Sequence, residues 1–366
     1  LPVDVVVVTD EAEQADRLNV FNDSSTADDI GWMEAPTLDN ELLKLGAPIN
    51  ITGLGMNPDA DGRSKSLTVD ISNAQDGADP TKLITFLGGI TFDDIEITEI
   101  MLGQGNDTFT IDATSVGTLG AGDNVVTVVH GGGNTILTDE DGNYVDENGD
   151  PSADPVIGGD HIMVTGGGGE NSPLVIFGDT SQDGARYDSQ PDDGIFTGNA
   201  LFYGLAGNDV IDASANENGV TIYGGRGNDT IWGSQAGDHL AGGSGNDTIY
   251  GGAGIDHIYG DSGFNLDYDV SKDANDEAIV TRLLTVPTVN LSTILTSDPL
   301  LAGSDTIRAG AGDDIVLGDH GVIGQAAGTL RLLTTGSVLT VATVETTNGT
   351  GDRIYGDEDD DIVIGG

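Results

Sequence analysis

The chain lacks cysteine and has few basic, aromatic or proline residues. Its 366 residues include no Cys, 11 Pro and only 12 Lys and Arg together, and aromatic residues make up 5%. Without cysteine there is no disulfide framework and no cysteine-ligated zinc site. Nucleic acid is not an expected partner, because recognition of phosphate needs clustered Lys and Arg. No apolar run approaches the ~18 residues of a membrane span, so no membrane span is expected.

Acidic residues and glycine, in contrast, are in large excess. The 62 Asp and Glu give a formal net charge of −50, and 57 residues are glycine. Self-repulsion of this size opposes any compact state. The hydrophobic fraction of 37% nevertheless argues against full disorder. A bound hard divalent cation, matched to carboxylate oxygen, resolves this conflict.

A nine-residue period runs through the second half of the chain. Written Gly-Gly-x-Gly-x-Asp-x-U-x, with U apolar, it fits Gly224–Trp232 at every position. Three more copies follow in phase up to Tyr259, and Gly260–Tyr268 is a degraded copy with Asn265 in place of the aspartate. Other complete or partial copies contain Asp209, Asp305, Asp314, Asp352 and Asp361, and looser ones contain Asp107 and Asp160.

This spacing predicts a stack of metal sites. If nine residues make half a coil, residues eighteen apart lie one above the other, so Asp229 and Asp247 line one edge and Asp238 and Asp256 the opposite edge. Carboxylates stacked ~4.8 Å apart repel unless a cation lies between them. Calcium takes about 6–8 oxygen ligands in tolerant geometry. Turn glycines allow main-chain oxygens to point at one centre, so several calcium ions are expected.

The candidate ligands are the aspartates at position six and the main-chain oxygens of the turns. The aspartates are Asp229, Asp238, Asp247, Asp256, Asp209, Asp107, Asp305, Asp314, Asp352, Asp361 and Asp160. The turn residues are Gly224, Arg226, Gly242, Ser244, Gly251 and Ala253. The acidic loop Asp139–Asp150 is a separate candidate, since its first acids have the spacing of an EF-hand loop, although Tyr144 stands where that loop needs glycine.

The repeats resemble those of the calcium-binding repeats-in-toxin (RTX, haemolysin-type) family. The resemblance implies a right-handed parallel β-roll and export by type I secretion, hence an extracellular or cell-surface location. We therefore expect an all-β chain: a right-handed parallel β-roll or β-solenoid with a β-rich N-terminal region and two insertions. The chain begins at Leu1-Pro2 and ends inside a repeat at Gly365-Gly366, so we expect it to be a segment of a large type I-secreted surface protein.

The sequence pattern divides the chain into five regions. They are a β-rich N-terminal region (1–100), an irregular glycine-rich solenoid (101–200), the RTX β-roll (201–268), an insertion (269–302) and a second RTX block (303–366) with a hairpin at about 322–348. The hairpin is expected to pair Leu330–Thr334 with Val338–Val344. Short helices are expected at Asp39–Leu45 and near Asn275–Leu284.

Two further sets of side chains recur with the period. His239 and His257 share position seven and are expected to stack as outward-facing residues, with a zinc pair as the alternative. Trp232, Tyr250 and Tyr259 share position nine, where they form either an aromatic stripe for carbohydrate or ordinary surface packing.

The leading hypothesis is a calcium-binding structural segment of a secreted or cell-surface protein. It would serve as an extracellular filament, stalk or adhesin extender that folds and rigidifies when it binds extracellular Ca²⁺. One alternative is a calcium-dependent secretion and folding module of a larger secreted enzyme or toxin, and another is a carbohydrate-binding adhesin module. The chain is not expected to be an enzyme, since it has no Gly-x-Ser-x-Gly, HExxH or P-loop motif. Expected partners are Ca²⁺, copies of the chain or adjoining segments end to end, and surface glycans.

Overall fold

The computed structural model describes most of the 366 residues. The described stretches are 16–22, 25–36, 47–70, 83–116, 125–146, 148–169, 172–179, 206–272, 278–282, 302–326, 338–344 and 346–365. Within them all the regular secondary structure is β-strand, as expected for an all-β chain. The helix expected near Asn275–Leu284 is wrong, because Ala278–Arg282 forms a strand. The helix expected at Asp39–Leu45 lies outside the described residues.

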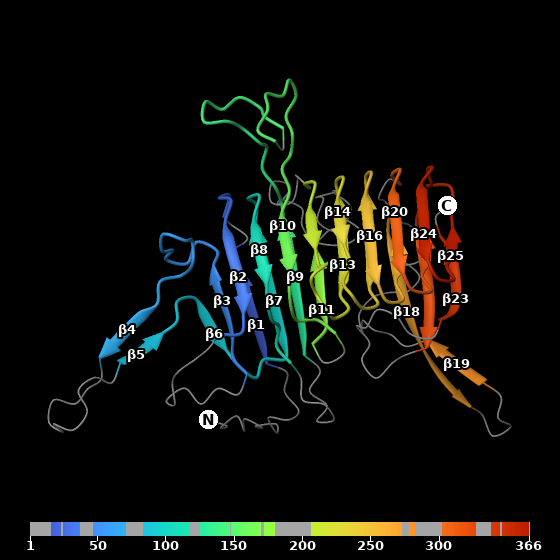
Figure 1. Cartoon of the computed structure of the whole chain (residues 1–366), viewed down its shortest axis with the longest axis horizontal. Coiled ribbons are helices and arrows are strands. Elements are labelled where there is room, and N and C mark those ends of the chain that lie inside the picture. Colours follow the sequence, from blue (N-terminus) through green and yellow to red (C-terminus); the bar gives the residue numbers. More distant parts are fainter. Residues whose placement is uncertain are drawn as a thin grey trace, which may run out of the picture.

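Two long, mainly parallel sheets run along the molecule (Figure 1). Sheet A has nine strands in the order β1 (Arg17–Phe21), β7 (Ile97–Gly103), β9 (Val126–Gly132), β11 (Leu174–Phe177), β13 (Thr221–Arg226), β15 (His239–Ser244), β17 (His257–Tyr259), β21 (Ile315–Leu317) and β25 (Ile362–Ile364). Sheet B has ten strands in the order β24 (Arg353–Glu358), β20 (Thr306–Ala311), β16 (Thr248–Ala253), β14 (Thr230–Trp232), β12 (Val210–Asp212), β10 (His161–Val164), β8 (Thr108–Ile111), β2 (Ile30–Glu34), β3 (Ile49–Gly53) and β6 (Ile90–Phe92).

The apolar residue at position eight of each repeat supplies the core between the sheets. Ile231 pairs in register with Ile249 in sheet B, and Leu240 pairs with Ile258 in sheet A. All four side chains are fully buried in one hydrophobic cluster. Successive copies of the repeat therefore alternate between the sheets, and residues eighteen apart stack, as in a parallel β-roll. The right-handed sense of the coil stays a prediction.

The sheets are continuous across the regions that the sequence pattern distinguishes. The predicted boundary at residue 100 falls inside β7 (Ile97–Gly103), and β1 and β2 pair in parallel with β7 and β8. Ile249 in β16 pairs with Ile307 in β20, so the coil also resumes in register after a long insertion. That first boundary therefore divides the repeat pattern and not the sheets.

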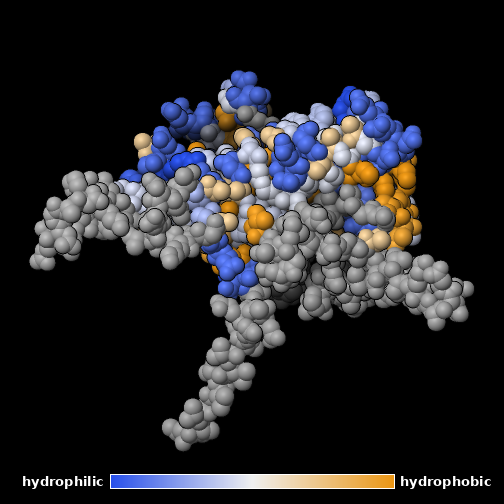
Figure 2. Space-filling model, turned by 60° about the horizontal axis from the view of Figure 1, so that its bottom comes forward, coloured by the Kyte–Doolittle hydropathy of each residue, from blue (hydrophilic) through white to orange (hydrophobic). Residues whose placement is uncertain are grey.

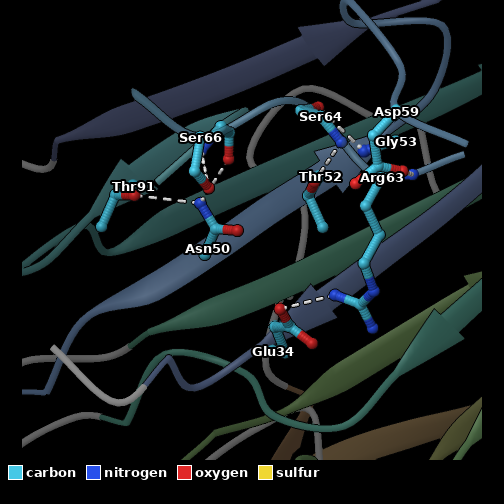
Figure 3. Close-up of polar contacts among 10 residues, drawn as sticks. Glu34, Asn50, Thr52, Gly53, Asp59, Arg63, Ser64, Ser66 and Thr91 are labelled. Atoms are coloured by element: carbon cyan, nitrogen blue, oxygen red, sulfur yellow. Dashed lines mark hydrogen bonds and ion pairs between the residues drawn. The ribbon is translucent and has the colours of Figure 1, made fainter. Parts of the chain in front are cut away.

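Antiparallel strands end sheet B at its N-terminal side. β3 pairs antiparallel with both β2 and β6, and every residue of β3 is buried. Figure 3 shows the polar contacts around it: the Asn50 side chain donates to Thr91 Oγ1 at 2.9 Å, and Arg63 donates to Glu34 Oε1 at 2.7 Å. A separate two-stranded sheet consists of β4 (Leu67–Asp70) and β5 (Leu83–Phe86).

The two C-terminal insertions together build a four-stranded sheet over sheet A. Its order is β19 (Ala278–Arg282), β18 (Gly263–Lys272), β22 (Gly321–Ala326) and β23 (Val338–Thr343). Tyr259 and Leu317 of sheet A form a second buried cluster with Ile323 of β22. This sheet corrects one expectation: Gly260–Tyr268 does not continue the coil, because β18 pairs with β22. β23 also pairs with β22, but its expected partner Leu330–Thr334 lies outside the described residues, so that hairpin stays a prediction.

Long insertions occur on both sides of the coil, and the one between β2 and β7 carries β3 to β6. We call edge one the side where the chain passes from sheet A to sheet B, and edge two the side where it returns. Four edge-one connections are long: β9–β10, β11–β12, β17–β20 and β21–β24. No helix formed by the described residues is long and apolar enough to cross a membrane.

Candidate metal centre

The aspartates at position six form two ladders, one along each edge. At edge one, the main-chain N–H of Asp229 donates to Asp247 Oδ1 at 2.8 Å, and the N–H of Asp247 donates to Asp305 Oδ1 at 2.8 Å. The edge-one ladder consists of Asp107, Asp160, Asp209, Asp229, Asp247, Asp305 and Asp352. The edge-two ladder consists of Asp238, Asp256, Asp314 and Asp361. All the predicted aspartates thus lie in one ladder or the other.

The second carboxylate oxygen of most ladder aspartates has no hydrogen-bond partner in the described part of the chain. Asp229 is 1% exposed, and its Oδ2 has no hydrogen-bond partner among the described residues. The same is true of Oδ2 in Asp107, Asp160, Asp209, Asp247, Asp256, Asp305 and Asp314. A buried polar atom without a partner costs about 1–3 kcal/mol, and more when it is charged. A row of such oxygens is the feature that a bound cation would compensate.

Glycines at position one shape the space next to these oxygens. A Cβ atom on Gly224 would lie 2.4 Å from Asp229 Oδ2 and 2.3 Å from the main-chain oxygen of Gly242. A Cβ on Gly242 would lie 2.4 Å from Asp247 Oδ2 and 2.2 Å from the oxygen of Gly260. Glycine is required here because a side chain would occupy this space. A carboxylate oxygen and a carbonyl oxygen from the next coil approach the same point, and both are ligands that calcium prefers.

Burial opposes the charged form of the ladder carboxyls. Burial, reinforced by the charge of Asp238, raises the pKa of Asp256 to about 9, and burial raises the pKa of Asp209 to about 7. The pKa values of Asp229 and Asp247 are also well above the ordinary value, because of burial and then of neighbouring aspartates. The protein matrix alone therefore does not favour ionised carboxylates, and a metal ion would have to displace their protons.

The residues fit calcium better than a metal bound only by side chains. Among the described residues, no three His, Asp or Glu side chains gather around a point where a metal ion could lie. A cation in a ladder would therefore take one or two carboxylates from neighbouring coils and complete its shell with main-chain oxygens. Calcium accepts such a mixed oxygen set, whereas zinc prefers four tightly placed nitrogen or sulfur ligands.

A family model described as the RTX calcium-binding nonapeptide repeat matches the chain in four copies, at residues 196–218, 221–236, 232–266 and 301–321. The chain carries RTX calcium-binding repeats. The matched residues include Asp209, Asp229, Asp247 and Asp305 of the edge-one ladder. No match was found among the curated proteins or among the solved structures.

The predicted main-chain ligands occupy two kinds of position in the RTX turns. Gly224 and Gly242 lie against the unpartnered oxygens described above, and a Cβ on Gly251 would lie 2.6 Å from Asp256 Oδ2. The Ser244 oxygen, in contrast, accepts the N–H of Gly227 at 2.9 Å. Arg226 and Ala253 lie in the same turns, at position three of their copies. Ligation by any of these oxygens stays a prediction.

Asp238 differs from the other buried RTX aspartates. Its Oδ1 accepts from the N–H of Val220 at 2.7 Å and from the Ser234 hydroxyl at 2.9 Å, and its Oδ2 accepts from the N–H of Ser234 at 2.5 Å. Ser234 stands at position two of its copy, where the pattern has glycine. Because both of its carboxylate oxygens accept hydrogen bonds from the protein, Asp238 needs a cation less than the other buried ladder aspartates do.

Three buried aspartates outside the predicted set adjoin the edge-one ladder. Asp179, Asp261 and Asp319 each have one oxygen without a partner among the described residues. Sequence reasoning assigned carboxylate ligands only at position six and missed these. The signal was the dipeptide Gly-Asp at positions one and two, which recurs at 178–179, 260–261 and 318–319.

The periodic histidines and aromatic residues are arranged differently from the expectation. His239 and His257 pair in register, but both are buried, and burial holds their pKa values at about 3 and about 4. Among the described residues no third metal-binding side chain joins them. Trp232 and Tyr250 stack with ring centroids 5.5 Å apart in sheet B, whereas Tyr259 is buried in sheet A, so the three residues do not form one stripe.

The EF-hand-like loop is a projecting hairpin held by its own turns. Asp139 Oδ1 accepts main-chain N–H groups of Asp141 and Asn143 at 2.9 and 2.8 Å. Asp146 repeats this arrangement with Asn148 and Asp150, both at 2.9 Å. These acids are not part of either ladder, and calcium binding by this loop stays a prediction.

Proposed function

We propose that this chain is a calcium-binding structural segment of a secreted or cell-surface protein, which becomes a rigid β-roll when Ca²⁺ fills its ladders. The observation that carries the proposal is the row of buried ladder-aspartate Oδ2 atoms that have no hydrogen-bond partner among the described residues, and all of them except Asp314 Oδ2 face a glycine of the turn. Calcium ions would occupy this row, held by ladder carboxylates and main-chain oxygens. Their chemical contribution is charge neutralisation, which lets acidic coils stack.

Calcium availability supports an extracellular setting for this role. Extracellular calcium modules have dissociation constants of about 10⁻⁴–10⁻³ M, so such sites fill outside the cell and stay empty at cytosolic calcium levels. A chain with a net charge of −50 then repels itself before export and folds after it. Each ion binds only the folded coil and so adds to its stability. Because neighbouring coils share sites, folding should spread from coil to coil.

Circular dichroism during a calcium titration tests the proposal. We expect little strand signal in chelator and a cooperative gain as calcium is added. Magnesium at the same concentration should have a much smaller effect, because it demands near-octahedral geometry at short distances. Equal strand content in chelator and in calcium would contradict the proposal.

Self-association end to end would extend such a segment. Ile362 and Val363 in β25, the last strand of sheet A, are 50% and 47% exposed, and Figure 2 shows a hydrophobic surface at this end of the molecule. A further coil, from an adjoining segment or from a second copy, would cover it. Sedimentation at increasing protein concentration with calcium tests this. Association that Ile362→Asp abolishes would support it, and a strict monomer would contradict it.

A carbohydrate-binding module is the second candidate. The stacked rings of Trp232 and Tyr250, which are only partly buried, favour it because flat aromatic faces bind sugar rings. Glycan-array binding in calcium, lost in Trp232→Ala, would support this reading. A secretion and folding module attached to an enzyme or toxin is the remaining alternative. A catalytic domain encoded beside this segment would favour it, whereas many copies of the segment would favour a filament or stalk.

A further inference from the structure

Aspartate replaces glycine where an insertion leaves the coil. In the uninterrupted edge-one turns, position two is Gly103, Gly225 or Gly243, all with positive φ. In three turns that carry a long insertion, position two is instead Asp179, Asp261 or Asp319. The substitution therefore follows the interruption of the turn.

One oxygen of each of these aspartates holds main chain of the coil. Asp261 Oδ1 accepts the N–H of Gly303 at 2.8 Å, and Asp319 Oδ1 accepts the N–H of Thr350 at 2.9 Å. Gly303 and Thr350 lie where the chain returns from the insertion that follows each aspartate. Asp179 Oδ2 accepts the N–H of Arg226 in the next coil at 2.7 Å. Asp261 and Asp319 thus each join the start of an insertion to its end, and Asp179 joins the start of the third insertion to the next coil.

The other oxygen of each is buried and unpartnered. Asp179, Asp261 and Asp319 are 5%, 0% and 4% exposed, and Asp179 Oδ1, Asp261 Oδ2 and Asp319 Oδ2 have no hydrogen-bond partner among the described residues. Asp261 lies near enough to Asp247, Asp305 and Asp319 for their charges to act on it. A Cβ on Gly349 would lie 2.7 Å from Asp319 Oδ2, so this oxygen also faces a glycine.

We propose that Asp179, Asp261 and Asp319 are additional calcium ligands, and that the sites at these insertion junctions bind calcium more tightly than the uninterrupted sites. After position two the chain enters the insertion instead of closing the turn, so the main-chain oxygens that follow are directed elsewhere; the Ser262 oxygen, for example, accepts the N–H of Gly321 at 3.0 Å. The extra carboxylate replaces a lost oxygen and adds a negative charge. Calcium affinity rises with the number of charged ligands. The inference rests on the proposed calcium-filled ladders, and it adds that the junction sites fill with calcium before the others.

The remaining long insertion provides a comparison within the same molecule. The connection from β9 to β10 has Gly132 at position two, and the buried Asn134 nearby has no hydrogen-bond partner for either side-chain polar atom among the described residues. A Cβ on Gly207 would lie 2.5 Å from Asn134 Oδ1. A neutral amide oxygen here, in place of a carboxylate, predicts a weaker site than at the other three junctions.

Asp261→Asn tests the proposal in the whole chain. Asparagine keeps an oxygen for the Gly303 N–H and removes the charge. Glu217→Gln is the matched control, because Glu217 is exposed and outside the ladders and the net charge changes equally. Calcium is counted by equilibrium dialysis, and the calcium midpoint of folding is measured by circular dichroism. We expect Asp261→Asn to lose one ion from the tightest class, to weaken that site at least ~10-fold, and to need more calcium to fold.

The opposite shift would overturn the proposal. If Asp261 is only an unpaired buried acid, asparagine relieves repulsion, so the calcium midpoint falls and the ion count is unchanged. If Asp261→Asn does not reach the wild-type strand content, the calcium count and the calcium midpoint of Asp319→Asn test the proposal instead. Failure of the underlying function is distinguishable, because the unaltered chain would then bind no calcium at all.

Discussion

At the scale of single residues, the two oxygens of a ladder aspartate have separate roles. Asp247 Oδ1 accepts the main-chain N–H of Asp229 in the neighbouring coil, and its Oδ2 lies against Gly242 and has no hydrogen-bond partner among the described residues. The nine-residue pattern predicted the acid, its edge and the need for glycine. It did not predict this division, because the pattern records which residues recur and not which atom each hydrogen bond uses.

Gly224→Ala tests the glycine requirement. The new Cβ would meet Asp229 Oδ2 and the Gly242 oxygen at 2.4 and 2.3 Å, so the turn must shift. We expect a loss of about 1–3 kcal/mol in the free energy of unfolding in calcium, and weaker calcium binding. Denaturant unfolding measures the first quantity. Gly351→Ala is the control, since a Cβ there meets no atom within 4 Å. Equal stability of the two variants would contradict this account of the turns.

Ladder aspartates should differ in their importance for calcium. Asp238 already has protein donors on both oxygens, whereas Asp247 Oδ2 has no partner among the described residues. We therefore expect Asp247→Asn to lower calcium affinity at least ~10-fold and Asp238→Asn to lower it much less. Calorimetric calcium titrations of the two variants, compared at equal strand content, measure this. A larger loss from Asp238→Asn would be inconsistent with the hydrogen bonds seen.

At the scale of elements, the coil could be predicted from the sequence, but the four-stranded sheet that covers sheet A could not. Alternation of Ile231, Leu240, Ile249 and Ile258 between two sheets follows from a nine-residue half-coil. The four-stranded sheet joins strands from two insertions that are far apart in the sequence, so no local sequence period predicts this pairing. Burial of His239 and His257 went unpredicted for the same reason.

Ile323→Ala tests whether this cover contributes to stability. Ile323 in β22 is fully buried in the cluster with Tyr259 and Leu317 of sheet A. We expect a cost of about 2–5 kcal/mol in the free energy of unfolding, the usual range for a large aliphatic core residue replaced by alanine. Denaturant unfolding in saturating calcium measures it, with the exposed Val363→Ala as the control. A cost no larger than that of the control would show that the cover packs loosely.

At the scale of the whole molecule, the excess of acid sets the conditions for folding. The net charge of −50 could be read from the sequence, and so could the need for cations. The structure adds which of the acidic side chains are buried. The pKa values of Asp305 and Asp209 rise from 3.8 to about 7, and that of Asp256 rises to about 9, chiefly through burial.

These raised pKa values predict an unusual pH dependence in chelator. The folded chain binds more protons than the unfolded chain, so this contribution to stability is complete below 3.8 and is lost as the pH rises through about 7 to 9. The lowered pKa values of His239 and His257 act in the opposite direction, but they are two groups against many. We expect strand content in chelator to rise as the pH falls from 8 to 5. In saturating calcium it should stay high at pH 8. More strand at pH 8 than at pH 5 in chelator would contradict this.

The position of calcium in a crystal grown with the ion tests the central claim most directly. Anomalous difference density should lie between successive coils, within roughly 2.3–2.6 Å of Oδ2 of Asp229, Asp247 and Asp305. Intact coils without density at these oxygens would show that the ladders stack without metal and would contradict the account.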